Sequence, residues 1–491
     1  MKRKFSKVLS ILLSVVLVIS SFYLLYQVIR LNVLPSKFLF PLTIGVVVLD
    51  AIFILLLIYF SKNVVSKIIC IVLTLFICVA SCIGGYYISK TQNVLSNITN
   101  VAKHAKNTVS VVVKESSSIK NKSQLNGVSV GSLRLNEQGS KKTLKELSSE
   151  GIVLNQKEYD SMTALLEAFY NGEVDSIIIN ESSRSQILDM EAYSNFDSNT
   201  RVVYQTSYKV KNNDSATSVS DITSKPFNVL ISGSDTRGGF DENGRSDVIM
   251  IATVNPKTHT ILLTSVPRDF YVTTACDAGD GCMQGALDKI THTGIHGTNT
   301  TKRTVEQLLG IEINYTFKVG FDTVTELVDV LGGVDVYVEP GYATTTSEFS
   351  VHEGVNHLNA QQALAFARER YSYIEGDRQR TKNQQQVLMG IVKEATKPSV
   401  ITNYAAIMDT MANTFSTTMS NEEITDLIKY QLNNNPTWKM EQYMVDGTGD
   451  TLMCAELGDA ASVMVPDQST VKMAKDKINA VLAGKSSEDV K

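Results

Sequence analysis

A short stretch of the sequence, "GSDTRGGFDENGRSD", gathers carboxylates and arginines between two apolar runs. The runs "FNVLI" and "VIMIATV" are typical of strands, so we expect the charged residues on the loop that joins them. Asp235 and Asp247 of this loop could hold Mg²⁺, with water and phosphate oxygens completing an octahedron. The alternative is a surface loop of ion pairs in which Arg245 neutralises one aspartate, and taken alone the stretch favours that alternative.

Three other segments supply arginines that could bind a diphosphate, because a guanidinium group is planar, permanently charged and matched to phosphate oxygens. "SVPRD" contains Arg268. "FARERYSY" holds Arg368 and Arg370, which face the same way if this segment is extended. "DRQRTKNQQQVL" places Arg380 and Gln384 four residues apart, on one face of a helix. With the opening loop, four segments each bring an arginine near the possible metal site. Together they predict a diphosphate site.

Three strands must bring these segments together, and they are expected at Phe227–Ser232, Val248–Val254 and Thr260–Val266. If the first two are antiparallel neighbours and the third returns after the turn "NPKTH", one edge of the sheet carries four of the residues. These are Asp235, Arg245, Asp247 and Arg268. The prediction fails if the first pair of strands is parallel.

Motifs for other chemistries are missing from the sequence, which has no G-x-S-x-G and no Walker-type loop. His292 and His296 are four residues apart, but their Thr/Gly-rich segment "THTGIHG" argues against a helix that would pair them on a metal. Asp377 could cap a helix that runs from Arg378 to about Ala395, and Arg378 and Lys382 are interpreted as solvated charges at its end. The remaining candidates can position and neutralise a phosphate, which is what phosphoryl transfer mainly requires.

Three apolar runs at Val8–Ile29, Phe38–Phe60 and Ile68–Ile88 are each long enough to cross a bilayer as a helix. The first run is too long for a signal peptide and lacks a small-residue cleavage site. The N-terminal tail and the second loop hold six Lys and Arg, against three on the other side. The positive-inside rule therefore puts the N-terminus inside and everything after about residue 90 outside, away from ATP and cytoplasmic cofactors.

The outer part divides by pattern into several regions. Residues 91–110 are polar and are interpreted as a stalk, and 111–208 alternate helix and strand patterns as in a small α/β accessory module. A Ser/Thr-rich linker follows, and the alternation beyond it predicts a layered α/β domain. Cys276 and Cys282 flank a short loop outside the membrane and are expected to form a disulfide. We expect a membrane part at 1–90, stalk, module and linker at 91–225, the main domain at 226–484 and a tail at 485–491.

Five ordered motifs resemble the LytR–CpsA–Psr (LCP) family: "GSDTR…GRSD", "SVPRD", "DKITHTGIHG", "VEQLLGIEINYTFKVGFDTVTELVDVLGGVDV" and "ARERYSYIEGDRQRTKNQQQVL". The resemblance implies an extracellular three-layer α/β/α domain with an apolar pocket for a polyprenyl chain. It also implies an enzyme that attaches capsular polysaccharide or a related polymer from a polyprenyl-diphosphate carrier to peptidoglycan. The three membrane spans and the accessory module are similar to those of capsule-associated members, whose partners include other capsule-assembly proteins.

By matched motif, the resemblance assigns roles to nine residues. Mg²⁺ would be held by Asp235 and Asp247. The diphosphate would be bound by Arg245, Arg268, Arg368, Arg370 and Arg380, with assistance from Gln384. Asp269 would lie close by in an orienting or metal-proximal role. The chain departs from the family pattern at Asn383, where members often have a second arginine, so one phosphate contact is expected to be weaker or to come from elsewhere.

Alternative hypotheses stay open beside the transferase. Asp235 and Asp247 are both candidates for the general base. A membrane regulator of capsule synthesis or transcription is suggested by the basic tail, yet a tail of about seven residues has no room for a helix-turn-helix, which disfavours DNA as a partner. A non-catalytic protein that binds the lipid carrier would use the same arginines.

Overall fold

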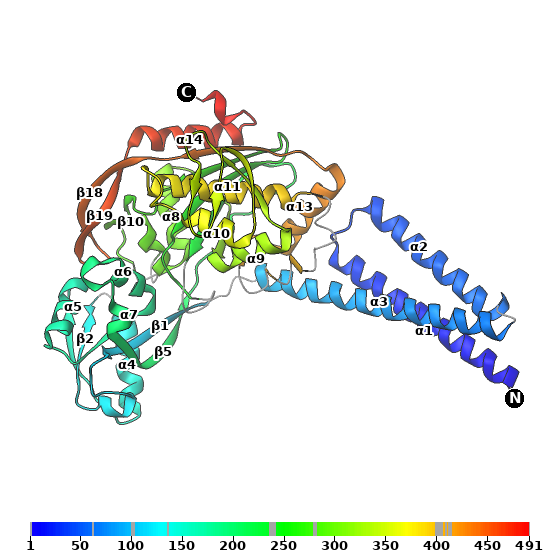
Figure 1. Ribbon diagram of the computed structural model, residues 1–491, viewed down its shortest axis with the longest axis horizontal. Coiled ribbons are helices and arrows are strands. Elements are labelled where there is room, and N and C mark those ends of the chain that lie inside the picture. Colours follow the sequence, from blue (N-terminus) through cyan, green and yellow to red (C-terminus); the bar gives the residue numbers. More distant parts are fainter. Residues whose placement is uncertain are drawn as a thin grey trace. The chain divides into compact units, whose positions relative to one another are not determined.

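The computed structural model describes residues 2–490 apart from 61–62, 100–103, 135–136, 235–241, 278–281, 398–405, 408–409 and 411–414 (Figure 1). The chain forms two compact units. The first comprises residues 1–99, 392–412 and 419–437, and the second comprises 100–391, 413–418 and 438–491. The second unit contains both the accessory module and the main α/β domain.

The first unit contains the three expected membrane helices, α1 (Lys2–Leu31), α2 (Ser36–Leu55) and α3 (Val64–Thr99). The segments long and apolar enough to cross a membrane are Lys7–Leu31, Ser36–Tyr59 and Val64–Thr99, which confirms the three predicted spans. Ser21 of α1 donates a hydrogen bond to Asp50 of α2 at 2.9 Å, so this carboxylate lies at a helix contact. The unit also includes α13 (Asn421–Asn434).

The predicted stalk at 91–110 is wrong. Residues 91–99 continue α3, and the chain from His104 onward belongs to the first strand of the accessory module. Polarity alone suggested a stalk, but an alternating strand that pairs on both sides can be polar at its start. Strand β1 (His104–Lys114) pairs along its whole length with β5 (Thr200–Lys211).

The accessory module is a five-stranded sheet in the order β3-β2-β4-β1-β5. Its other strands are β2 (Ser129–Leu133), β3 (Asn155–Tyr159) and β4 (Ser176–Asn180). Its helices are α4 (Glu137–Ser149), α5 (Met162–Asn171), α6 (Arg184–Asp189) and α7 (Phe196–Asn199). Separate buried clusters lie against the two faces of the sheet, one around Phe169 of α5 and one around Leu147 of α4. The expected α/β module is therefore present.

The main domain is built on a six-stranded sheet in the order β16-β11-β6-β7-β8-β17. The strands are β6 (Phe227–Ser234), β7 (Val248–Asn255), β8 (Thr260–Val266), β11 (Tyr315–Gly320), β16 (Phe415–Thr417) and β17 (Lys439–Met444). β6 and β7 are antiparallel, as are β7 and β8, which confirms the order on which the site prediction depended. β11 runs parallel to β6, and β17 parallel to β8. The ends of β6, β8, β11 and β17 and the start of β7 therefore share one edge.

Helices cover both faces of this sheet. Every residue of β8 is buried, as expected when both faces of a strand are covered. One core packs the sheet against α8 (Thr298–Leu309) and α14 (Gln468–Leu482). A second core joins α9 (Phe321–Leu331), α10 (Ala360–Arg368) and α11 (Asp377–Ala395) to the hairpin of β12 (Val334–Val338) and β15 (Gly354–Leu358). Gln385 of α11 donates to the carbonyls of Leu263 and Tyr443 at 3.3 and 2.8 Å, which fixes α11 against the sheet.

Local signals in the sequence agree with most element ends. Gly310 ends α8 in the left-handed conformation that favours glycine, with φ 61°. Asp377 lies in the first turn of α11 and not before it, where it was expected as a cap. The segment "THTGIHG" forms no α-helix: Ile290–His296 are the 3₁₀ helix η6, in which residues three apart, and not four apart, share a face. This short helix follows the strand pair β9 (Tyr271–Thr273) and β10 (Leu287–Lys289).

The accessory module and the main domain share a core. The hairpin of β18 (Gly447–Cys454) and β19 (Asp459–Pro466) belongs to the main domain by sequence, yet its Leu457 and Val463 pack with Phe169 of α5. Two hydrogen bonds reinforce the contact, from Met162 N to the Leu457 carbonyl at 2.9 Å and from Thr163 N to Asp459 at 3.0 Å. The module is thus held on the main domain by a common apolar interior.

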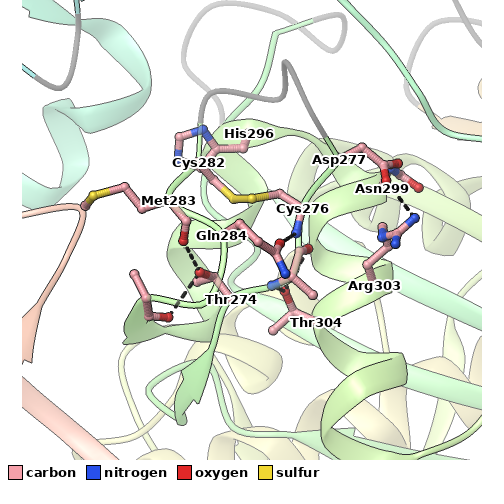
Figure 2. Close-up of a disulfide and its surroundings, with 12 residues drawn as sticks. Thr274, Cys276, Asp277, Cys282, Met283, Gln284, His296, Asn299, Arg303 and Thr304 are labelled. Carbon is pink, nitrogen blue, oxygen red and sulfur yellow. Dashed lines mark hydrogen bonds and ion pairs between the residues drawn. A yellow bond between two sulfur atoms is a disulfide. The ribbon is translucent and has the colours of Figure 1, made fainter.

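Cys276 and Cys282 form a disulfide, which confirms the predicted pairing (Figure 2). Hydrogen bonds fix the backbone on both sides, from Cys276 N to Gln284 at 2.6 Å and from the Thr274 hydroxyl to the Met283 carbonyl at 2.7 Å. The ion pair of Asp277 with Arg303 of α8, at 2.7 Å, ties the bridged loop to the domain.

The double substitution Cys276→Ser with Cys282→Ser should lower the free energy of unfolding by about 2 kcal/mol, the chain-entropy value for so short a loop. Urea unfolding of the full chain in detergent, followed by the fluorescence of the single tryptophan Trp438, measures this change. Cys82→Ser is the control, because Cys82 is an exposed free cysteine. A thiol titration that gives the same count before and after reduction would contradict the pairing.

Candidate active site

The segment that carries Arg245 and Asp247 is anchored by buried hydroxyl groups. The Ser246 hydroxyl lies 2.9 Å from that of Ser232 at the end of β6 and 3.0 Å from that of Thr301 on α8. The Asp247 amide donates to the Gly233 carbonyl at 2.8 Å. These bonds fix the start of β7, so the acid and the arginine on either side of Ser246 project from a rigid base.

A glycine on η6 allows this segment to approach. A Cβ on Gly294 would stand 2.5 Å from the Gly244 carbonyl and 2.6 Å from the Ser246 amide, closer than any side chain can come. The Ser246 amide donates to the Thr291 carbonyl at 2.9 Å across the same contact. The motif "DKITHTGIHG" therefore serves partly as a support for the loop opposite it.

Asp247 and Arg268 form the central ion pair of the site. Asp247 Oδ1 accepts a hydrogen bond from Arg268 Nη1 at 2.9 Å and one from the Thr291 hydroxyl at 3.4 Å. Arg245 Nε lies 3.9 Å from the same oxygen. The three charged side chains are between 11% and 16% exposed. The ion-pair alternative is thus partly right, although the arginine that neutralises Asp247 most directly comes from the end of β8.

Asp269 is a second acid of the site and lies between Arg268 and Lys289. Its Oδ1 lies 3.1 Å from Lys289 Nζ, and its Oδ2 lies 4.0 Å from Arg268 Nε. Burial would raise the pKa of Asp269, but the charges of Lys289 and Arg268 outweigh it and hold the pKa below its ordinary value. Burial likewise disfavours charge on Arg268, yet Asp247 and Asp269 raise the pKa of its guanidinium. Asp269 and Arg268 are therefore both charged at neutral pH.

Arg380 joins the cluster from the first turns of α11. Its Nη2 lies 2.5 Å from Asp377 Oδ1. Burial lowers the pKa of the Arg380 guanidinium, and the positive charges of Arg268 and Arg370 lower it further, so that they outweigh the acids nearby. A guanidinium stays charged at neutral pH despite such a shift. The lowered pKa shows that Arg380 lies among other cations, so a bound anion would stabilise its positive charge.

Three arginines keep an unused donor inside the site. The Nε atoms of Arg245, Arg268 and Arg380 are buried and make no hydrogen bond with any residue that the structure describes. Leaving a buried charged donor unpaired costs free energy, so such groups are expected to meet a ligand or water. Phosphate oxygens fit, because each can accept from several guanidinium groups.

The structure separates the remaining predicted residues. Arg370 is half-buried, stacks on the Tyr371 ring at 4.6 Å and acts electrostatically on Arg380. Arg368 is exposed and is the last residue of α10, so the expectation that Arg368 and Arg370 face the same way along an extended segment is wrong. Gln384 is half-buried on α11, one turn beyond Arg380.

Two other polar residues of α11 have structural partners. Arg378 donates from Nε to Asp446 at 2.7 Å and from Nη2 to the Gly447 carbonyl at 2.8 Å. Asn383 is buried and donates to the Phe366 carbonyl at 3.0 Å. Asn383, where the chain departs from the family pattern, thus joins α11 to α10.

The described residues meet the requirements of a magnesium site only in part. Asp235 lies outside the described residues. Within the described part of the chain, no three His, Cys, Asp or Glu residues are grouped as metal ligands. Asp247 accepts hydrogen bonds from Arg268 and Thr291 through Oδ1, and its Oδ2 makes no hydrogen bond with a described residue. Magnesium commonly uses one or two carboxylates together with substrate phosphates and water, so Asp247 fits such a role.

Four contributors to the site were not predicted from the sequence. Lys289 and Thr291 lie within a motif that was recognised, but nothing in the motif indicated that they contact Asp269 and Asp247. Asp377 was seen only as a helix cap. The fourth is Asp189 at the end of α6, which forms an ion pair with Arg245 Nη1. No local pattern marks Asp189, because its partner is 56 residues away.

Comparison with known proteins gives consistent matches. The LytR_cpsA_psr family model matches residues 192–480. A Bacillus cereus (strain AH820) protein named polyisoprenyl-teichoic acid–peptidoglycan teichoic acid transferase TagU is 31% identical over 241 residues, 48% of this chain and 76% of that protein. The Bacillus subtilis (strain 168) protein of the same name is 34% identical over 203 residues, 41% of this chain and 63% of that protein. A crystal structure of B. subtilis TagU is 28% identical with a TM-score of 0.41, and the match covers 52% of this chain and 97% of that one.

Arg380→Ala should weaken binding of geranyl diphosphate about tenfold or more, because a buried charged donor is lost. Arg378→Ala is the matched control from the same helical turn, and it should change the affinity by less than about threefold because its donors are already used by Asp446 and Gly447. Calorimetric titration of the full chain in detergent measures both. Equal losses in the two variants would show that α11 contributes only general positive charge.

Proposed function

Because the chain belongs to the LytR–CpsA–Psr family, we propose that it is a membrane-anchored transferase that moves a glycopolymer from a polyprenyl-diphosphate carrier onto peptidoglycan. The observation that carries the proposal is the set of three largely buried guanidinium groups at one sheet edge, each with an Nε that makes no hydrogen bond within the described part of the chain. They come from the start of β7, the end of β8 and α11, which are far apart in the chain. A site assembled in this way suits a compact, multiply charged anion.

The polymer is proposed to be a capsular polysaccharide or a related glycopolymer. The three membrane helices and the accessory module support this choice through the resemblance to capsule-associated members. The relatives' names specify teichoic acid, which is the second candidate polymer. The main domain would work outside the cell, as the distribution of Lys and Arg around the apolar runs predicts.

The reaction balances without a nucleotide. The oxygen of a peptidoglycan hydroxyl forms a bond to the phosphorus that carries the polymer, and the bond from that phosphorus to the bridging oxygen breaks. Polyprenyl monophosphate leaves, and the hydroxyl proton passes to Asp235 or Asp247. The energy comes from the diphosphate linkage of the donor itself.

The charged side chains would act mainly on the departing phosphate. Arg268 and Arg380 would donate from their free Nε atoms to its oxygens as negative charge develops there. Asp247 would hold Arg268 in place by the 2.9 Å bond, so the guanidinium needs no reorganisation during the reaction. Rigid anchoring of the "GRSD" segment by Ser232 and Thr301 supports the same function.

A magnesium ion is part of the proposal. Asp247 would hold it through Oδ2, with Asp235 as the second carboxylate. When bound, the ion would neutralise negative charge on the phosphates.

Purified full-length protein should transfer polymer from a polyprenyl-diphosphate donor to peptidoglycan in the presence of Mg²⁺. Arg268→Ala should reduce the rate about a hundredfold or more, the size expected when a preorganised charged donor is removed. Arg303→Ala, on the surface beside the disulfide, should transfer at the wild-type rate. Binding of the donor without any turnover would instead identify a carrier-binding protein.

Chelation with EDTA should stop transfer, and added Mg²⁺ should restore it. Ca²⁺ should restore it poorly, because it takes more oxygen ligands at longer distances than this site offers. Affinity for geranyl diphosphate should fall on chelation in the wild type, and Asp247→Asn should lose this dependence on metal. Undiminished transfer in EDTA would exclude the metal from the mechanism.

A further inference from the structure

The accessory module holds the returning end of the charged loop. Glu242 is 5% exposed, and its carboxylate lies 3.1 Å from Lys106 Nζ on β1 and accepts a hydrogen bond from the Thr108 hydroxyl on the same strand. The Glu242 carbonyl accepts from Lys318 Nζ of β11 at 2.6 Å. This residue of the loop is therefore fixed by the module on one side and by the central sheet on the other.

Three residues farther along, the module reaches the site itself. Arg245 Nη1 is ion-paired with Asp189, the last residue of α6. Arg245 is 11% exposed and Asp189 is 56% exposed, so the acid approaches a nearly buried guanidinium from the open side. The other end of the group, Nε, lies 3.9 Å from Asp247. Arg245 is thus held between an acid of the module and an acid of the main domain.

The support beneath Asp189 is rigid. Arg184 begins α6 and donates to Glu181 at 2.6 and 2.7 Å and to Asp197 at 3.0 Å, with a side chain only 10% exposed. An acid in the last turn of a helix opposes the helix dipole, so Asp189 is placed at a position where it gains from a cation outside the helix. Arg245 is that cation.

The shared core makes this approach stable. Leu457 and Val463 of the β18–β19 hairpin are packed with Phe169 of the module, so the two parts of the unit have a continuous interior. Asp189 and Thr108 therefore meet the loop from a surface whose position is set by apolar packing. The apolar packing positions the module, and the polar contacts of Asp189 and Thr108 then orient the side chains of the loop.

We propose that the accessory module completes the transferase site, with Asp189 as a positioning residue for Arg245. Asp189 holds Nη1, while the buried Nε, 3.9 Å from Asp247, makes no hydrogen bond with a described residue and is left for a diphosphate oxygen. Glu242, held by Thr108, fixes the backbone that leads to Arg245. This inference rests on the proposed function, and it gives the module a part in binding the donor's diphosphate.

Asp189→Asn tests the inference in the full-length protein, since the change removes the charge and keeps the shape. We expect the dissociation constant for geranyl diphosphate, and the KM for the polymer donor, to rise on the order of tenfold, as for one lost charge-assisted hydrogen bond. kcat should change much less than KM. Asp189→Glu should recover most of the affinity, and Thr108→Val should weaken binding in the same direction through Glu242.

Glu150→Gln is the matched control, because Glu150 forms an ion pair with Lys122 on the surface of the same module. It should bind and transfer as the wild type does. Wild-type affinity in Asp189→Asn would overturn the inference. Tighter binding would overturn it too, because Asp189 would then compete with the diphosphate. Equal losses of affinity in Asp189→Asn and Glu150→Gln, or no recovery of affinity in Asp189→Glu, would show that the module has only a structural role.

The proposed function fails separately from this inference. If the wild type transfers polymer and Arg268→Ala does not, the site is established, and only then does the behaviour of Asp189→Asn decide the role of the module. If the wild type binds geranyl diphosphate without transferring polymer, the binding measurement still tests Asp189.

Discussion

Burial of positive charge at one edge of the sheet is the constraint on which the site depends. A terminal nitrogen of each of three arginines forms an ion pair with an acid: Arg268 with Asp247, Arg245 with Asp189 and Arg380 with Asp377. Each keeps a buried Nε that makes no hydrogen bond with a described residue. The acids lower the cost of burying the guanidinium groups, and they leave the donors incompletely used. The arrangement therefore buries the charges and still leaves donors for the anion that we propose binds here.

The scaffold explains why such a cluster can be rigid. Strand β8, which ends at the site, is buried on both faces, and electrostatic interactions of Arg268 with Asp377 and Arg380 place the first turns of α11 beside its end. Hydroxyl groups of Ser232, Ser246 and Thr301 replace water around the loop, which would otherwise carry unpaired polar groups into the interior. Small and hydroxylated residues in the loop motifs thus reflect packing as much as chemistry.

Sequence patterns predicted the local features well. Apolar periodicity and turn residues located the strands, and the antiparallel order of β6, β7 and β8 that the site prediction assumed is the one observed. That order was enough to bring Arg245, Asp247 and Arg268 together. Predictions were wrong where tertiary contacts decide the structure: α10 continues through Arg368, and residues taken for a stalk form part of α3 and β1. Asp189 and Lys289 could not be foreseen, because their roles depend on packing between distant segments.

The interior shared by the β18–β19 hairpin and α5 has a consequence for how such chains can diversify. A chain cut at the linker before β6 would leave Leu457 and Val463 facing solvent, and the module alone would lose one wall of its core. Exchange of the module between related proteins therefore requires exchange of the hairpin as well. The hairpin and the module are almost 300 residues apart in sequence, yet we expect them to be exchanged only together.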